Sequence, residues 1–329
     1  MAKQESEQPP SLAMEFPRDK DQYALSAVIG ISEAATMHKA KHVNPATQDE
    51  VAVGIKIVNS YEIEDIYSLA TEVHEAESCD HENVVKVHCS FKYQGQLWIV
   101  MPPLPRLSIR SMIRASFPRG LPENAVAFIL KETLKALNYM HGKNRLHQNL
   151  GADCLFLDGT SRVKVAFRSL TYDQNSNDLN SSVFPDWMIA PELMIDYRKG
   201  QSKATDIWMF GLLALELFYG RIPASNLEEF QSFVLGIDDK LRMLKKNQGI
   251  VGSGLFRKIG VFSCFSNKDR KKISKPLVEV MAACLSREPK KRPTTNQLME
   301  YKLFQRCFTE KDTSLAKLKK ACTNITAHN

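Results

Sequence analysis

The order of repeating patterns along this chain limits its fold more than any single motif does. Residues 23–58 contain three segments in which apolar and polar side chains alternate, as they do in half-buried strands. Residues 63–76 carry apolar side chains at spacings of three and four, which is typical of an amphipathic helix. Two more strand-like segments follow at 83–91 and 96–101. The first hundred residues therefore predict three strands, one helix and two further strands.

The rest of the chain is predicted to be mostly helical. One helix should begin near Pro122 and end at Gly142, because proline is favoured in a first helical turn and glycine at a helix end. Further helices are predicted at 204–219, where the sequence is apolar on every side, at 276–285 and at 294–303. The proline-containing segment 101–105 joins the two regions. This order predicts an α+β fold with a small β-rich lobe and a large α-helical lobe.

The length of 329 residues agrees with one large domain or two lobes. The predicted parts are a flexible N-terminal tail at 1–18, a β-rich lobe at 19–101, an α-helical lobe at 102–308 and a C-terminal tail at 309–329. Hydrophobic residues make up 43% of the chain and charged residues 25%. That composition excludes a chain that is disordered, collagenous or coiled-coil throughout.

Cysteine usage and hydropathy indicate the compartment. The 7 cysteines are odd in number and form no CxxC pair, so neither a disulfide framework nor a zinc ribbon is expected. The N-terminus has no apolar segment of the signal-peptide type. The most apolar stretch, 207–220, is too short to cross a bilayer and contains Glu216. We therefore expect a cytoplasmic or nuclear protein with neither signal peptide nor transmembrane segment.

The net charge of +7 is concentrated in one segment. Residues 242–275 hold ten Lys and Arg residues and one acid, Asp269, which gives +9 and leaves −2 for the other residues. The segment also contains several glycines, which predict an irregular insert. It can be a solvated loop, or its apolar and basic side chains can contact an acidic partner or an anionic membrane. Nucleic acid is not expected to bind, because no recognition helix is evident.

Three motifs in the second half resemble those of protein kinases. They are WMIAPE at 187–192, which has one residue more than the usual motif, DIWMFG at 206–211 and PKKRP at 289–293. Together with the order of the lobes and the segment 116–147, they make the chain similar to the sterile-twenty-related, germinal-centre group of Ser/Thr kinases over residues 16–308. Within that group, the sequence most resembles the plant branch that includes the blue-light-signalling kinase, and segment 116–147 carries this similarity most strongly.

This resemblance implies a two-lobed kinase fold and assigns structural roles. His147 and Asp206 fall at positions with a structural role, Asp206 at the start of a helix, and Glu192 and Arg292 fall at positions that form a buried ion pair. Breaking such a pair costs about 3–5 kcal/mol, because it leaves one charge buried without a partner.

The positions that carry chemistry in kinases are occupied here by other residue types. Asn149 stands where the catalytic aspartate is expected, and an amide cannot act as a carboxylate base. Loss of a general base lowers the rate by about 10²–10⁴. Gly151 replaces the catalytic-loop lysine, and Cys154 and Phe167 replace the two metal ligands. A thiol is a poor ligand for Mg²⁺, and Asp153 is the one nearby carboxylate considered as a substitute.

The nucleotide-binding positions are also altered. Of the glycine-rich loop only Gly30 remains, while Ser32 and Ala35 replace later glycines and Glu33 adds a charge that opposes phosphate. Lys56 lies sixteen residues before Glu72, which predicts the usual ion pair between this strand and the following helix. The resemblance assigns the vestigial nucleotide pocket to Gly30, Met37, Lys56, Glu72, Met101, Leu104 and Phe156.

The size of the adenine pocket remains open at this level. Met37 and Phe156 are larger than the usual residues and predict a collapsed pocket, whereas Gly54 could open its roof. Leu104 retains a backbone N–H for adenine, which Pro103 and Pro105 cannot supply. No cofactor is expected to be required, and any ATP that binds should bind weakly and without metal.

Two functions from different classes follow from these residues. In the first, the chain is a pseudokinase that acts as a signalling adaptor or allosteric scaffold by binding an active kinase or another signalling partner, without phosphotransfer. In the second, it is a weakly active, atypical Ser/Thr protein kinase in which Asp153 or a partner supplies the missing carboxylate. The simultaneous loss at Asn149, Gly151, Cys154 and Phe167 favours the first.

Overall fold

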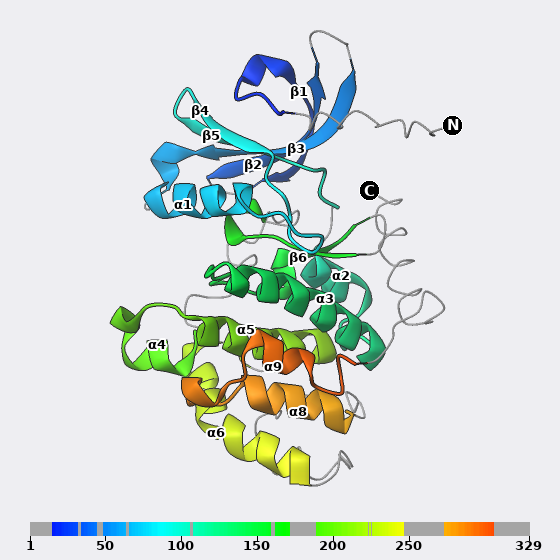
Figure 1. The fold of residues 1–329 in the computed structure, drawn as a ribbon, viewed down its shortest axis with the longest axis vertical. Helices are drawn as coiled ribbons and strands as arrows, with labels where there is room; N and C mark the ends of the chain where they lie inside the picture. The colour runs from blue at the N-terminus through cyan, green and yellow to red at the C-terminus, as the bar shows by residue number, and fades with distance from the viewer. Residues whose placement is uncertain are drawn as a thin grey trace, which may run out of the picture.

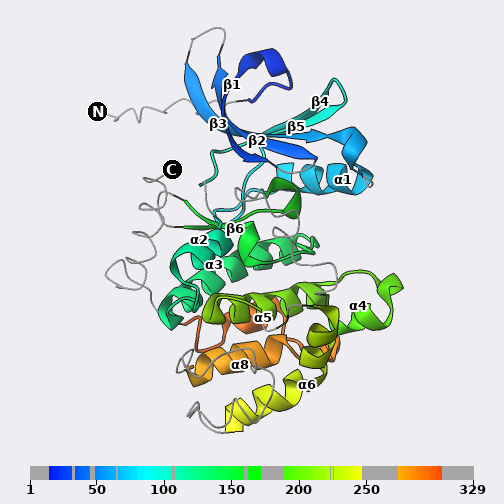
Figure 2. The same cartoon turned by 180° about the vertical axis from the view of Figure 1, so that it is seen from behind.

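The chain forms a sheet-containing lobe above a helical lobe, which confirms the predicted α+β, two-lobed fold (Figures 1 and 2). In the computed structural model the backbone of 238–246 is described without side chains. The described residues are 15–31, 34–44, 49–63, 66–105, 108–158, 162–171, 189–222, 224, 226–246 and 273–305. Predictions about Ser32, Glu33, Trp187, Met188 and the insert residues 247–272 lie outside these ranges.

The upper lobe is built on one antiparallel sheet of five strands in the order β1-β2-β3-β5-β4. The strands are β1 (Tyr23–Ile31), β2 (Ala35–Val43), β3 (Glu50–Asn59), β4 (Cys89–Tyr93) and β5 (Gln96–Met101). The register places Lys56 of β3 opposite Met37 of β2 and opposite Ile99 of β5. Helix α1 (Ile66–Glu77) packs against this sheet, and only Val73 and Ala76 of the helix are fully buried. These elements confirm the three strands, the helix and the last strand that were predicted.

The predicted strand at 83–91 is wrong over its first half. Residues before Cys89 turn away from the sheet, because the side-chain amide of Asn83 donates to the Glu132 carboxylate at 2.9 Å and to the Val163 carbonyl at 2.9 Å. The amide of Val85 donates to the Val165 carbonyl at 2.8 Å. The segment therefore ties the upper lobe to the lower one.

The lower lobe is mostly helical, with a small two-stranded sheet at its top (Figure 1). Its elements are α2 (Ile109–Ser116), α3 (Glu123–Gly142), β6 (Leu155–Leu157), β7 (Val163–Val165), α4 (Pro191–Ile195), α5 (Lys203–Tyr219), α6 (Leu227–Lys246), α8 (Lys275–Cys284) and α9 (Thr295–Met299). Helix α3 confirms the prediction from Pro122 to Gly142, and Pro122 is its N-cap. Helix α9 is shorter than the helix predicted at 294–303. It ends at Met299, and Glu300 is its C-cap.

Helix α5 is the centre of the lower lobe. A capping box between Ser202 and Thr205 begins it, and Gly220 ends it in the left-handed conformation at φ +83°. Every residue from Thr205 to Tyr219 is buried, which confirms the buried helix predicted at 204–219. A Cβ atom at Gly211 would lie 2.6 Å from Cγ of Leu285, so the glycine allows the chain after α8 to pack directly against α5.

Two predictions about the ends of the ordered regions need correction. The flexible tail predicted at 1–18 is wrong for its last residues, because the ring of Phe16 stacks on His88 at 3.9 Å and the guanidinium of Arg18 donates to the Ser90 carbonyl at 2.8 Å. The irregular insert predicted at 242–275 is wrong at its two ends, because α6 continues to Lys246 and α8 begins at Lys275.

Candidate nucleotide cleft and catalytic loop

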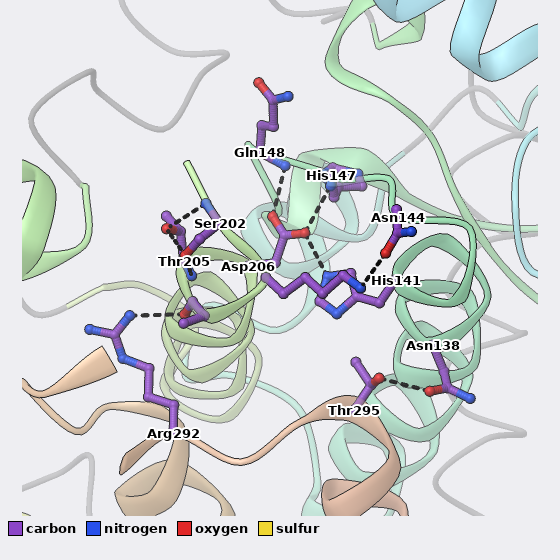
Figure 3. A network of polar contacts seen from close by, with 12 residues as sticks. Asn138, His141, Asn144, His147, Gln148, Ser202, Thr205, Asp206, Arg292 and Thr295 are labelled. Carbon is purple, nitrogen blue, oxygen red and sulfur yellow. Dashed lines mark hydrogen bonds and ion pairs between the residues drawn. The ribbon is translucent and has the colours of Figure 1, made fainter. Parts of the chain in front are cut away.

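The catalytic loop is anchored by Asp206, a completely buried carboxylate at the start of α5 (Figure 3). Its two oxygens accept hydrogen bonds from the backbone N–H of His147 at 2.9 Å and of Gln148 at 2.8 Å. Nε2 of His141 lies 2.8 Å from the same carboxylate. Gln148 has φ +68°, a conformation that an ordinary side chain adopts only at a cost, and its bond to Asp206 holds it there. Asp206 therefore fixes the backbone of the loop at 147–148 to the start of α5.

Asn149 faces a cavity of about 630 Å³ between α1 and the lower lobe. Described residues around it include Glu72 and Glu75 from α1, together with Phe167 and Arg168. The Asn149 side chain is uncharged, so it can position a hydroxyl group but cannot remove its proton. Asn149 therefore lies beside the cavity as an uncharged polar side chain.

Phe167 occupies the position of the second metal ligand as a core residue. It is 1% exposed, and its ring stacks on His147 with centroids 5.8 Å apart and planes 5° from parallel. Nε2 of His147 lies 3.1 Å from the carbonyl oxygen of Ala166, which fixes the imidazole beneath the phenyl ring. An aromatic ring offers no ligand to Mg²⁺, and the space where a carboxylate would act is filled by apolar atoms.

Cys154, at the other metal position, is equally unsuited to a hard cation. Its thiol is buried and donates to the Asn149 carbonyl oxygen at 3.3 Å. Burial raises the pKa of the Cys154 thiol well above its ordinary value, and the neighbouring Asp153 adds to that effect. The thiolate that a metal would require is therefore disfavoured. Magnesium nucleotide does not fit the residues at either metal position.

Asp153, the carboxylate considered as a substitute, lies in a buried cluster with Arg110 and Glu216. It lies 3.4 Å from the guanidinium of Arg110, which also binds Glu216 at 2.6 Å. Burial raises the pKa of Asp153, and Arg110 opposes that shift. Sequence reasoning missed this buried cluster, because Arg110, Asp153 and Glu216 are far apart in the chain. Among the described residues, no group of three or more His, Cys, Asp or Glu side chains is arranged to hold a metal ion.

The predicted ion pair between Lys56 and Glu72 is wrong. Nζ of Lys56 donates instead to the Thr171 carbonyl oxygen at 2.6 Å, and Oε1 of Glu72 accepts from the Ser169 amide at 3.0 Å. Both side chains therefore hold the backbone of the turn η4 (Arg168–Leu170) and its following residue. Burial lowers the pKa of Lys56 to about 8; Glu72 acts against this shift and Arg168 reinforces it. The two charged groups hold a turn of the chain in the cleft rather than each other.

The lowered pKa of Lys56 predicts a pH-dependent stability difference. Unfolded Lys56 keeps the ordinary pKa of 10.5, so between about pH 8 and 10.5 the unfolded state binds more protons than the folded one. The free energy of unfolding of wild type, minus that of a Lys56→Met variant, should therefore rise between about pH 8 and 10.5 and be constant below about pH 8. Urea unfolding of both proteins at pH 7 and pH 10 measures the difference, and Lys92→Met, at an exposed position of β4, is the control. A difference that does not change with pH would contradict the assigned environment.

The adenine region is closed by Met37. This side chain is 1% exposed, and its Cε lies 3.0 Å from where a Cβ of Gly54 would be. The same position is 3.3 Å from the Pro102 carbonyl oxygen and 3.6 Å from Met101, so it lies beside the segment that joins the lobes. Gly54 therefore does not open the pocket, because Met37 fills the space that the missing Cβ leaves.

The other pocket residues are packed in a similar way. Phe156 is 1% exposed and pairs through its backbone with Ser108, while Gly30 and Met101 are buried and Leu104 packs against the main core. Large apolar side chains thus occupy the positions that the resemblance assigns to adenine.

The ion pair predicted between Glu192 and Arg292 is confirmed. Both oxygens of Glu192 accept from Arg292 at 2.7 Å, a bidentate arrangement. The guanidinium, whose side chain is 0% exposed, also donates to the Ala204 carbonyl at 2.9 Å and lies 5.0 Å from the ring centre of Trp208. Arg292 therefore links α4, through Glu192, to the start of α5, through Ala204. Figure 3 shows Arg292 beside the start of α5.

The sequence matches the profile of the family described as "Protein kinase domain" over residues 23–304. It is 28% identical over 296 residues to serine/threonine-protein kinase fray2 of Dictyostelium discoideum, covering 88% of this chain and 26% of that protein. It is 27% identical over 311 residues to germinal center kinase 3 of Caenorhabditis elegans, covering 88% and 48%. It is 25% identical over 317 residues to serine/threonine-protein kinase 1 of Arabidopsis thaliana, covering 95% and 34%.

These relatives are Ser/Thr kinases that include the sterile-twenty, germinal-centre type. The chain spans between about a quarter and a half of the length of the relatives described above.

Proposed function

Because this chain belongs to the protein kinase family, we propose that it is a pseudokinase, a member that keeps the fold and does not transfer phosphate. One observation carries the proposal. Phe167, at the position of a metal-binding aspartate, is buried and stacked on His147, so that position is part of the apolar core. Asn149, Gly151 and Cys154 support the same conclusion, because each replaces a group that the family's chemistry uses.

The proposed pseudokinase requires no cofactor. Met37 fills the space next to Gly54, and Lys56 donates to the Thr171 carbonyl rather than remaining available to a phosphate. Any ATP that binds should therefore bind weakly and independently of metal, at the residues assigned to the vestigial pocket.

Nucleotide binding tests this proposal directly. Ligand that binds only the folded state raises the melting midpoint, so a thermal melt with excess ATP should show no change that depends on Mg²⁺. Met37→Ala creates room for adenine and is the informative variant: metal-independent stabilisation by ATP should increase in it relative to wild type. A large, magnesium-dependent shift in wild type would contradict the proposal and favour the weakly active kinase.

Without phosphotransfer, the retained fold serves as a binding module. We propose that the partner is an active kinase or another signalling protein, which the chain holds or regulates as an adaptor or allosteric scaffold. The proposed partner rests on analogy at the level of the fold, namely that a kinase fold without phosphotransfer serves to bind another protein. We further propose that the chain belongs to the plant branch of its group. This proposal rests on the amino-acid sequence of 116–147 and on the similarity to the Arabidopsis kinase. Stoichiometric recovery of an active kinase with the native protein would support the adaptor role.

The basic insert is the proposed contact with an acidic partner or an anionic membrane. Deletion of 249–272 should leave the fold intact and abolish that binding, because it removes most of the excess positive charge. Sedimentation with anionic liposomes and partner pull-downs, each at low and at high salt, measure the loss. Equal binding by the deletion and by wild type at both salt concentrations would show that the insert is only a loop.

No helix in the described part of the chain has the length and apolar character needed to cross a bilayer. We propose a cytoplasmic or nuclear location on the cysteine usage and the N-terminal sequence.

A further inference from the structure

A second cavity, of about 470 Å³, lies in the lower lobe where the end of α3 meets the starts of α5 and α9. It is called the lower cavity below. Its described lining shares no residue with that of the cavity beside Asn149, so it is separate from the altered catalytic positions. Its volume is in the range of small-molecule sites, about 300–1,000 Å³. None of its described lining residues is an aspartate or a glutamate.

Lys203, the first residue of α5, brings a positive charge to the lower cavity. Its ammonium group donates to the side-chain oxygen of Asn144 at 2.9 Å, and this acceptor is neutral. Arg292 also lines the cavity, but both of its terminal nitrogens are already bound to the Glu192 carboxylate. Lys203 is an exposed residue, so its charge is accessible to an anionic ligand.

The same face of α5 supplies an apolar wall. Lys203 and Ile207 are four residues apart, which places them on one face of the helix. Ile207 is 1% exposed, and Ala204 and Pro293 add further apolar surface to the lining. The lower cavity therefore combines a buried apolar wall with a cation at an exposed position.

Asn138 of α3 adds a neutral hydrogen-bond donor. Its side-chain oxygen accepts from the Thr295 hydroxyl at 2.7 Å, a contact that links α3 to α9 (Figure 3). Because the oxygen is engaged in this bond, the NH₂ group of Asn138 is the part that can donate to a ligand. One ammonium and one amide group match a singly charged carboxylate. A doubly charged phosphate is matched less well, because the guanidinium of Arg292 is paired with Glu192.

We propose that the lower cavity is a binding site for a small amphiphilic carboxylic acid. The carboxylate contacts Lys203 and Asn138, and the apolar chain packs on Ile207. This site goes beyond the proposed binding of a protein partner, and it does not depend on whether the chain transfers phosphate. Short unbranched alkyl acids are the simplest ligands of this class.

NMR titration of the isotope-labelled full chain with hexanoate tests the site. Hexanoate should give saturable shifts of the backbone amides of Ala204 and Thr295, which lie in the lining. Acetate should bind at least about tenfold more weakly, because it lacks the apolar chain whose burial favours binding. Hexylamine has the chain but the opposite charge, and it should also bind more weakly than hexanoate.

Substitutions at Lys203 separate its charge from its shape. Lys203→Met removes the charge and keeps a long side chain, so it should weaken hexanoate binding about twofold to fivefold, whereas Lys203→Arg should retain binding. Lys199→Met removes an exposed cation outside the lining and should have no effect. The proposal is overturned if hexanoate shifts no lining amide, or if acetate or hexylamine binds there with the same affinity. It is also overturned if Lys203→Met binds hexanoate as tightly as wild type.

Discussion

Replacing Arg292 by alanine should lower the melting midpoint by about 6–12 °C. The substitution leaves the Glu192 carboxylate buried without its bidentate partner, and breaking a buried pair in this way costs about 3–5 kcal/mol. A loss of about 3 kcal/mol, the lower end of that range, corresponds to about 6–12 °C at about 2–4 °C per kcal/mol. The loss also removes the donor to the Ala204 carbonyl, so α4 and α5 lose a common anchor.

The control for this change is Arg287→Ala, which removes the same side chain from an exposed position nearby. It should shift the midpoint by no more than about 2 °C, as surface substitutions usually do. Lys56→Ala should also cost much less than Arg292→Ala, because burial already penalises the charged form of Lys56. Equal shifts for Arg292→Ala and Arg287→Ala would show that the pair does not support the fold.

The fold followed from the sequence where neighbouring residues determine the outcome. Strand-like patterns predicted β1, β2, β3 and β5, and Pro122 and Gly142 placed the ends of α3. Helix α2 was missed, since its eight residues are too few to establish a period. Residues 83–88 were predicted as strand because three of the six are valines, but the Asn83 side chain directs them toward the lower lobe.

The sequence predicted which residues occupy the candidate site better than it predicted their side-chain contacts. Asn149 and Phe167 could be assigned from motif positions, and so could the Glu192–Arg292 pair, because those motifs fix the spacing of the chain. The pairing of Lys56 depends on how far α1 stands from β3, which is a tertiary property. Here the turn η4 supplies a backbone acceptor for Lys56 and a backbone donor for Glu72.

Met37 illustrates the same limit. Gly54 alone predicts an open roof, and Met37 alone predicts a partly filled pocket. The two residues are not opposite each other in the register, where Gly54 faces Lys39 and Met37 faces Lys56. Their packing depends on the direction that the methionine side chain takes, and this direction leaves 3.0 Å between its methyl group and the missing Cβ position.

Restoring the two carboxylates should not restore a normal kinase. In Asn149→Asp combined with Phe167→Asp, a base and one metal ligand return, and loss of a base alone accounts for about 10²–10⁴ in rate. Gly151 and Cys154 remain, Met37 still closes the adenine region, and Lys56 still holds Thr171. The new aspartate at 167 would also lie in the apolar core, where a charge is costly. The double variant should therefore show no more than trace phosphotransfer.

Phosphotransfer by the purified wild-type chain tests the central claim most directly. Labelled ATP and magnesium are supplied with a generic basic protein substrate, and incorporation is compared with heat-denatured protein and with Lys56→Met, whose residual signal reports a contaminating kinase. A pseudokinase predicts that wild type, Lys56→Met and the denatured protein give the same background. Robust incorporation by wild type that is lost in Lys56→Met would contradict the account and establish an active enzyme.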